Sequence, residues 1–189
     1  EQAGLKPQRV GLRPNACQFA VNSLLDPTPH DLVLFVDVGP QTTEIDVILQ
    51  GRLVFSRAAD VAIPETLDTP LSDSTIAHLS ETKGLSLVSP PERGPSTLDR
   101  VVRELMIEVT RSIEAYRATD PGVSVDYAVV GGACDVEEAL VEAIQKQYNI
   151  TAQPYNPAAC FGWDADRGAA AGAFAAPLGL ALSLSADEQ

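Results

Sequence analysis

The sequence is poor in the residues from which metal sites and disulfide frameworks are built. Its 189 residues include two histidines and three cysteines, Cys17, Cys134 and Cys160. The cysteines are odd in number and widely separated, and they include no C-x-x-C pair. We therefore expect reduced thiols in a cytoplasmic protein and no structural zinc site.

Long apolar runs are also lacking. No run reaches the roughly 18 apolar residues that a membrane-spanning helix needs, so we expect no transmembrane helix and no direct membrane insertion. No basic segment followed by an apolar one opens the chain, so we expect no signal peptide. The first residue is Glu1 rather than Met, which favours a piece cut from a longer protein.

Basic side chains are few, and this limits the partners. The chain has 13 basic and 26 acidic side chains, a formal net charge of -13. Such a field repels phosphate backbones and anionic membrane surfaces, so nucleic acid is not expected as a partner. A bound nucleotide would need backbone amides and a metal ion to balance its charge.

Hydrophobic residues make up 45% of the chain, enough for a sizeable core, and their spacing predicts a mixed α/β fold. Three apolar segments joined by short turns predict an antiparallel strand meander. Ser96 is the expected cap of a long amphipathic helix, and Pro177 is a possible kink in a later helix of small residues. The expected strands are 32–39, 42–49, 53–63, 123–132 and 150–156, and the expected helices are 14–25, 72–84, 96–118, 135–149 and 165–184.

The first expected hairpin carries a candidate phosphate site. Asp37 ends an apolar strand, where its carboxylate can hold a water or Mg²⁺. Gly39 allows a sharp turn and a close approach by a phosphate, and the hydroxyls of Thr42 and Thr43 can donate hydrogen bonds to it. Asp-Gly turns are equally common in ordinary hairpins, and Pro40 removes one backbone donor. Both interpretations remain open from these residues alone.

A second glycine site lies between an expected strand and an expected helix. Gly131 and Gly132 present no Cβ, so a ligand could lie flat against them near the positive end of the helix. A tight strand–helix turn without a ligand explains the same residues. Asp135 is expected to cap the helix. His30, His78, Cys160 and Trp163 fall in expected loops or surface segments without a motif that assigns them chemistry.

The order of these features resembles the second lobe of the actin-like ATPase superfamily, which has a ribonuclease H-like fold. Within that superfamily, the sequence is similar to the PilM family of type IV pilus assembly proteins. The stretches that carry the resemblance are "LFVDVGPQTTEIDVILQGRLVFSR" (34–57), "IEVTRSIEAYRA" (107–118) and "VVGGACDVEEALVEAIQKQYNI" (129–150). The resemblance implies a crossover helix in residues 1–30 and the lobe itself in residues 31–189, with a reduced inserted region at about 62–95.

The resemblance also implies a nucleotide site shared between two lobes. Asp37, Gly39, Thr42 and Thr43 would face the phosphates of ATP, with Asp37 toward Mg²⁺, and Gly131 and Gly132 would lie against the nucleoside. The family's first lobe and its water-polarising acid are absent from this chain, and Ala133 stands where members often carry a third glycine. We expect no hydrolysis and weak or no ATP binding by this chain alone, because half of the cleft's contacts are missing.

The implied function is a cytoplasmic scaffold of type IV pilus or related secretion assembly. It would be peripheral to the inner membrane through partner assembly proteins, and it is a possible homo-oligomer. One alternative is an interaction module without nucleotide binding, similar to the actin-like domain of type II secretion L proteins. A second alternative is one lobe of a sugar or acetate kinase, since fold does not fix function.

Overall fold

The computed structural model describes residues 11–25, 32–65, 67, 96–164 and 171–186. The expected helix at 72–84, both histidines and most of the expected inserted region lie outside these residues. None of the helices in the described ranges combines the length and the apolar composition needed to cross a bilayer.

A five-stranded mixed sheet forms the centre of the molecule, with the strands in the order β3-β2-β1-β4-β5. The first three strands pair antiparallel, as the sequence predicts, and β4 and β5 extend the sheet in parallel with β1. The strands are β1 (Leu32–Val38), β2 (Thr43–Leu49), β3 (Arg52–Ala59), β4 (Tyr127–Gly132) and β5 (Thr151–Pro154).

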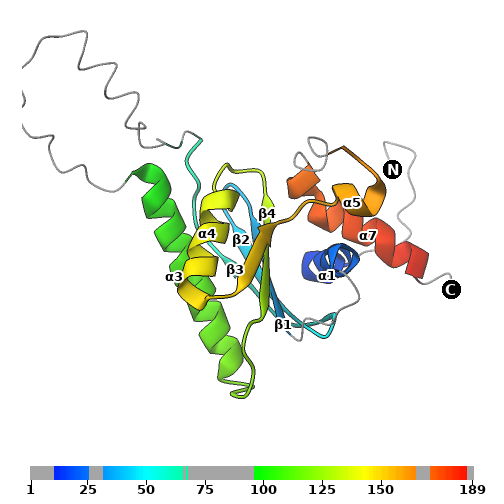
Figure 1. Ribbon diagram of the computed structural model, residues 1–189, viewed down its shortest axis with the longest axis horizontal. Coiled ribbons are helices and arrows are strands. Elements are labelled where there is room, and N and C mark those ends of the chain that lie inside the picture. The colour runs from blue at the N-terminus through cyan, green and yellow to red at the C-terminus, as the bar shows by residue number, and fades with distance from the viewer. Residues whose placement is uncertain (1–10, 26–31, 66, 68–95, 165–170, 187–189) are drawn as a thin grey trace, which may run out of the picture.

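The helices α3 (Thr97–Arg117) and α4 (Glu137–Tyr148) cover one face of the sheet (Figure 1). Ser96 caps α3 as expected, because its hydroxyl accepts from the Asp99 backbone N–H at 3.0 Å while the Asp99 carboxylate accepts from the Ser96 N–H at 3.0 Å. The apolar face of α3 packs onto alternate residues of β1 and β2 in the larger core. The principal α3 residues in this core are Val101, Leu105, Met106, Val109, Ile113 and Tyr116.

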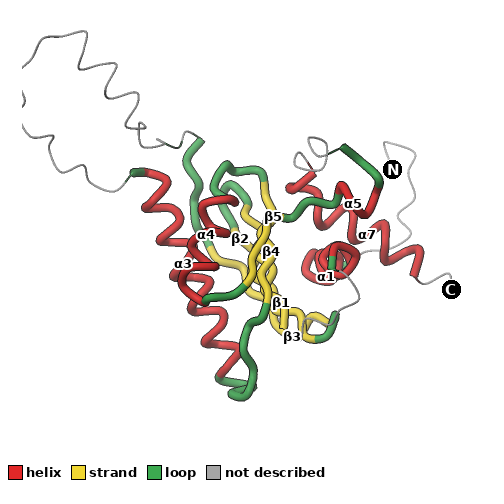
Figure 2. The backbone as a smooth tube through the Cα atoms, in the orientation of Figure 1, coloured by secondary structure: helices red, strands yellow, loops and turns green. Residues whose placement is uncertain are grey.

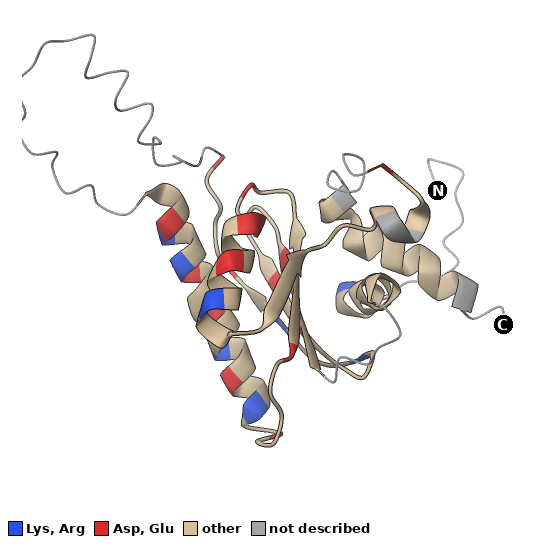
Figure 3. Ribbon diagram, in the orientation of Figure 1, with Lys and Arg blue, Asp and Glu red and all other residues tan. Residues whose placement is uncertain are grey.

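The helices α1 (Arg13–Leu24) and α7 (Ala175–Ala186) cover the opposite face, together with the short α5 (Ala158–Phe161), so the molecule has three layers (Figure 2). Polar side chains of α1 fasten it to the β2–β3 turn. The Asn22 side chain donates to the Gly51 carbonyl at 2.7 Å, and the Gln18 side chain accepts from the Leu53 N–H at 2.8 Å. The two outer layers differ in the number of charged side chains, which are many on α3 and α4 and few on α1 and α7 (Figure 3).

Three local expectations were wrong. Residues 165–170 of the helix expected at 165–184 lie outside the described residues, and the rest forms a 3₁₀ turn, η1 (Ala171–Phe174), and then α7. Pro177 therefore lies in the first turn of a helix and interrupts no backbone hydrogen bond there. Cys160, expected in a loop, lies in the short helix α5. Asp135 is not the cap of α4: it has a φ of 59°, and the cap position is Val136, without a side-chain cap hydrogen bond.

Candidate functional site

The two predicted glycine sites lie side by side at one end of the sheet. The strands β1 and β4 are parallel neighbours, and their register pairs Asp37 with Gly131 and Val38 with Gly132. The first hairpin and the turn after β4 therefore emerge from adjacent strand ends. This is the kind of position at which α/β proteins bind ligands.

Asp37 is buried at the end of β1, with 2% of its surface exposed. Its carboxylate accepts a hydrogen bond from the guanidinium of Arg13, the first residue of α1, and the two groups form an ion pair. Burial raises the pKa of Asp37, and the Arg13 charge offsets part of that rise. The carboxylate predicted to face Mg²⁺ is thus already neutralised by a cation of the same chain.

The tip of the hairpin is tight, and its two threonines differ. A Cβ added at Gly39 would lie 2.7 Å from the Thr42 carbonyl oxygen, so the turn requires glycine. Thr42 is exposed. Thr43 is fully buried on the same side of β2 as Ile45 and Val47, and its hydroxyl has no hydrogen-bond partner. In this arrangement Thr42 is open to a ligand, whereas the Thr43 hydroxyl faces the core.

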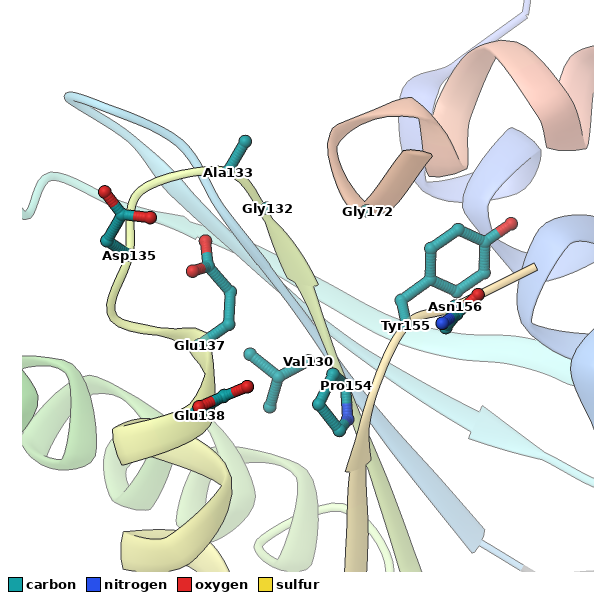
Figure 4. Close-up of a pocket in the computed structure, with 10 residues that line it drawn as sticks. All are labelled: Val130, Gly132, Ala133, Asp135, Glu137, Glu138, Pro154, Tyr155, Asn156 and Gly172. Atoms are coloured by element: carbon teal, nitrogen blue, oxygen red, sulfur yellow. The ribbon is translucent and has the colours of Figure 1, made fainter. Parts of the chain in front are cut away.

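A pocket of about 600 Å³ opens beside the turn after β4 (Figure 4). Gly132 lines it, whereas Gly131 packs beneath, where an added Cβ would lie 3.2 Å from the Phe35 ring. Gly132 has a φ of 138°, and an added Cβ would lie 2.6 Å from the Val38 carbonyl oxygen. The residues lining the pocket are Val130, Gly132, Ala133, Asp135, Glu137, Glu138, Pro154, Tyr155, Asn156 and Gly172.

The charge of the pocket is negative. Among the residues that the structure describes, the lining includes the carboxylates of Asp135, Glu137 and Glu138 and no lysine or arginine. Glu137 also holds the turn in shape, because its carboxylate accepts from the Cys134 N–H at 2.7 Å and from the Val136 N–H at 3.0 Å. The carboxylates lie on the α4 side of the pocket, opposite Tyr155 and Asn156 (Figure 4). Such a lining suits an uncharged, hydroxyl-bearing group such as a nucleoside better than a phosphate.

The described residues therefore fit only part of a nucleotide with Mg²⁺. The pocket, with no Cβ at Gly132 to obstruct it, has room for a nucleoside. Asp37 does not fit a bound Mg²⁺ in this arrangement, because Arg13 already occupies its carboxylate. Of the two predicted threonine contacts to phosphate, the exposed Thr42 is open to a ligand, whereas the Thr43 hydroxyl is buried.

A group of ionisable residues beneath α1 was not among the predicted site residues. Glu44 and Asp46 project from β2 toward α1, and Cys17 of α1 lies over them. Burial raises the pKa of Asp46 to about 7, and the nearby Ser56 hydroxyl on β3 offsets only part of that rise. Neither oxygen of Asp46 has a hydrogen-bond partner by distance and angle. Burial also raises the pKa of the Cys17 thiol and of Glu44, which Arg13 partly offsets.

The sequence indicates part of this group, through the alternation of β2, but it does not indicate Arg13 as its neighbour. The alternation in β2 does place Glu44 and Asp46 on one face, opposite Ile45 and Val47, but gives them no partner. Arg13 precedes Asp37 by 24 residues, and no local pattern links them.

Comparison with known proteins supports the fold and a family. The family model described as type IV pilus assembly protein PilM matches residues 1–183. No curated protein sequence matches the chain.

Solved structures show the same fold. One is a PilM-PilN type IV pilus biogenesis complex, with a TM-score of 0.65 and 20% identity over 96% of this chain and 54% of that one. An archaeal actin homologue has a TM-score of 0.52 and 13% identity, over 95% of this chain and 55% of that one. MreB5 of Spiroplasma citri bound to ADP has a TM-score of 0.51 and 12% identity, over 93% of this chain and 60% of that one. The expected actin-like fold is confirmed, and the chain spans little more than half the length of these proteins.

Proposed function

The chain belongs to the PilM family of type IV pilus assembly proteins, and from this membership we propose that it is one lobe of a nucleotide-responsive scaffold in pilus assembly. The observation that carries the proposal is the pairing of β1 with β4. It sets the Asp37 hairpin beside the Gly132 pocket at one sheet end, and this arrangement supports the proposal that the lobe contributes half of a nucleotide cleft.

In this proposal the nucleotide is a ligand that favours one arrangement of two lobes. The pocket beside Gly132 would hold the nucleoside of ATP, the hairpin with Thr42 would face the phosphates, and the first lobe of a longer parent would supply the remaining phosphate contacts. Any Mg²⁺ would need Arg13 to release Asp37, or would be held by the other lobe. Fast turnover is not required, since differential binding alone shifts a two-state equilibrium. We assign no catalytic residue in this chain.

The partner in this proposal is a pilus assembly protein of the PilN type, because the PilM structure that this chain resembles is a complex with PilN. The scaffold would lie on the cytoplasmic side of the inner membrane, held there by partners rather than by a span of its own. Self-association is compatible with this role.

A second candidate function is an interaction module that has lost nucleotide binding, as in type II secretion L-like systems. The Arg13–Asp37 ion pair favours it, because a cation of the chain stands where a bound metal would be needed. Pro40 and the exposed Ala133 are in keeping with it.

An experiment on the two-lobed parent separates the two candidates. We would measure its affinity for the cytoplasmic segment of its PilN-type partner with and without ATP. Ala133→Phe should fill the pocket from an exposed position, and Ala118→Phe is the matched control, since Ala118 is exposed and does not line the pocket. We expect ATP to change partner affinity in the wild type and in Ala118→Phe but not in Ala133→Phe, with basal partner binding intact in all three. If ATP does not change partner affinity in the wild type, the second candidate is supported. If the wild type does not bind the partner at all, both candidates are contradicted.

A further inference from the structure

A buried group of three potential metal ligands lies between α1 and β2, away from the pocket beside Gly132. Cys17 contributes its sulfur, and Glu44 and Asp46 contribute carboxylate oxygens, all within 4.8 Å of one another. Cys17 and Asp46 are fully buried, and the Glu44 side chain is 15% exposed. The residues come from one turn of a helix and from alternate positions of the strand beneath it, so both elements hold the group in place.

The charge of this group is not balanced by the described protein. Neither oxygen of Asp46 has a hydrogen-bond partner, and Glu44 Oε2 has none either. Arg13 is the cation that the described residues place here, but its guanidinium pairs with Asp37, and its Nε lies 3.4 Å from Glu44 Oε2. The single Arg13 charge thus lies near three carboxylates, and it makes direct contacts to Asp37 and Glu44 but not to Asp46. An unpaired carboxylate in a dry interior is costly unless a proton or a cation neutralises it.

The donor set identifies the class of cation. Mg²⁺ and Ca²⁺ prefer sites made only of oxygens, whereas a thiolate together with carboxylates suits Zn²⁺ and similar borderline-soft ions. With the Cys17 thiolate formed, Asp37, Glu44 and Asp46 ionised and Arg13 charged, the group has a net charge of about -3, which a divalent cation would reduce to about -1. We propose that Cys17, Glu44 and Asp46 form a binding site for a zinc-class divalent cation.

Binding at this site joins α1 to β2. The Cys17 thiol releases its proton to solvent as the sulfur binds, and the two carboxylates and the thiolate leave one position for a water. The site does not depend on nucleotide binding, so it stands or falls separately from the proposed function.

Cobalt(II) tests the site, because thiolate ligation gives Co²⁺ a near-ultraviolet charge-transfer band. We would titrate Co²⁺ into the reduced 189-residue chain, and then displace it with Zn²⁺. We expect one Co²⁺ with a thiolate band in the wild type and loss of the band in Cys17→Ser. Cys134→Ser is the matched control and should keep it, since Cys134 is a partly buried free cysteine outside the group.

Asp46→Asn provides a second test, because it keeps the side-chain shape and removes the charge. Changes in outer-shell residues already weaken metal binding by roughly 10–100-fold, so loss of a direct carboxylate ligand should weaken it by at least about 100-fold. Circular dichroism on each variant would show that the fold is retained. The proposal is overturned if the wild type shows no thiolate band, if the band survives in Cys17→Ser, or if Asp46→Asn binds Co²⁺ as tightly as the wild type.

Discussion

At the scale of single residues, the acidic side chains under α1 differ in how their charge is balanced. Asp37 has the Arg13 guanidinium against it, and Asp46 has no hydrogen bond to either oxygen. Burial raises the pKa of both carboxyls; at Asp37 the paired Arg13 guanidinium offsets part of the rise, whereas the pKa of Asp46 reaches about 7. Arg13 therefore determines whether the hairpin end of β1 can accept another cation.

Asp46 should make the metal-free chain less stable as the pH rises. Its folded pKa of about 7 exceeds the ordinary value of 3.8, so its contribution to stability is present below pH 3.8 and is lost as the pH rises to about 7. In the presence of EDTA, Asp46→Asn should raise the free energy of unfolding by about 2 kcal/mol at about pH 8 and by much less at about pH 5. Urea unfolding at both pH values measures this.

The matched control for this prediction is Asp60→Asn, because Asp60 is an exposed carboxylate. It should change stability little at either pH. An Asp46→Asn variant with the same pH dependence as the wild type would show that Asp46 is not the group responsible.

At the scale of elements, a contact between small residues sets the distance between α1 and α7. A Cβ added at Gly179 of α7 would lie 1.7 Å from the Ala16 carbonyl oxygen of α1, so the helix backbones touch there. The neighbouring α1 residue Ala20 is also fully buried. This close approach keeps α1, and with it Arg13 and Cys17, in position over the sheet.

Gly179→Ala should therefore destabilise the chain, although Gly→Ala in an exposed helix usually stabilises by roughly 0.5–1 kcal/mol. We expect a loss of about 1–3 kcal/mol in the free energy of unfolding, because the helices must move apart to accept the methyl group. Chemical denaturation measures the loss. Gly122→Ala is the control, because an added Cβ there meets nothing within 4 Å, and a Gly179→Ala variant as stable as the control would contradict the close contact.

Much of the element order could be predicted from the sequence because its signals are local. The β2 alternation indicates two faces, and Ser96 with Asp99 marks the start of α3, as the structure confirms. Features that depend on distant segments gave no such signal. The Arg13–Asp37 pair joins residues far apart in sequence, and the Gly179 contact depends on how two helices pack. The site residues Gly39, Thr42 and Thr43 remain predictions as ligand contacts.

At the scale of the whole molecule, charged side chains are unevenly distributed between the helices on the two faces of the sheet. The helices α3 and α4 carry many charged side chains, and α7 carries none (Figure 3). In the part of the chain that the structure describes, the sheet end with the Asp37 hairpin and the Gly132 pocket offers carboxylates and one paired arginine. A lobe with these features would bind a nucleotide only when a second lobe contributes positive charge and backbone amides.

The measurement that tests this account most directly is calorimetric titration of ATP with Mg²⁺ into this chain and into its two-lobed parent. The account predicts binding by the parent and none by this chain, because in the proposed function a second lobe would supply half of the cleft's contacts. Binding by this chain with the affinity of the parent would contradict the shared cleft. Absence of binding by both would contradict a nucleotide-responsive scaffold and leave the Asp37 hairpin as a structural turn neutralised by Arg13.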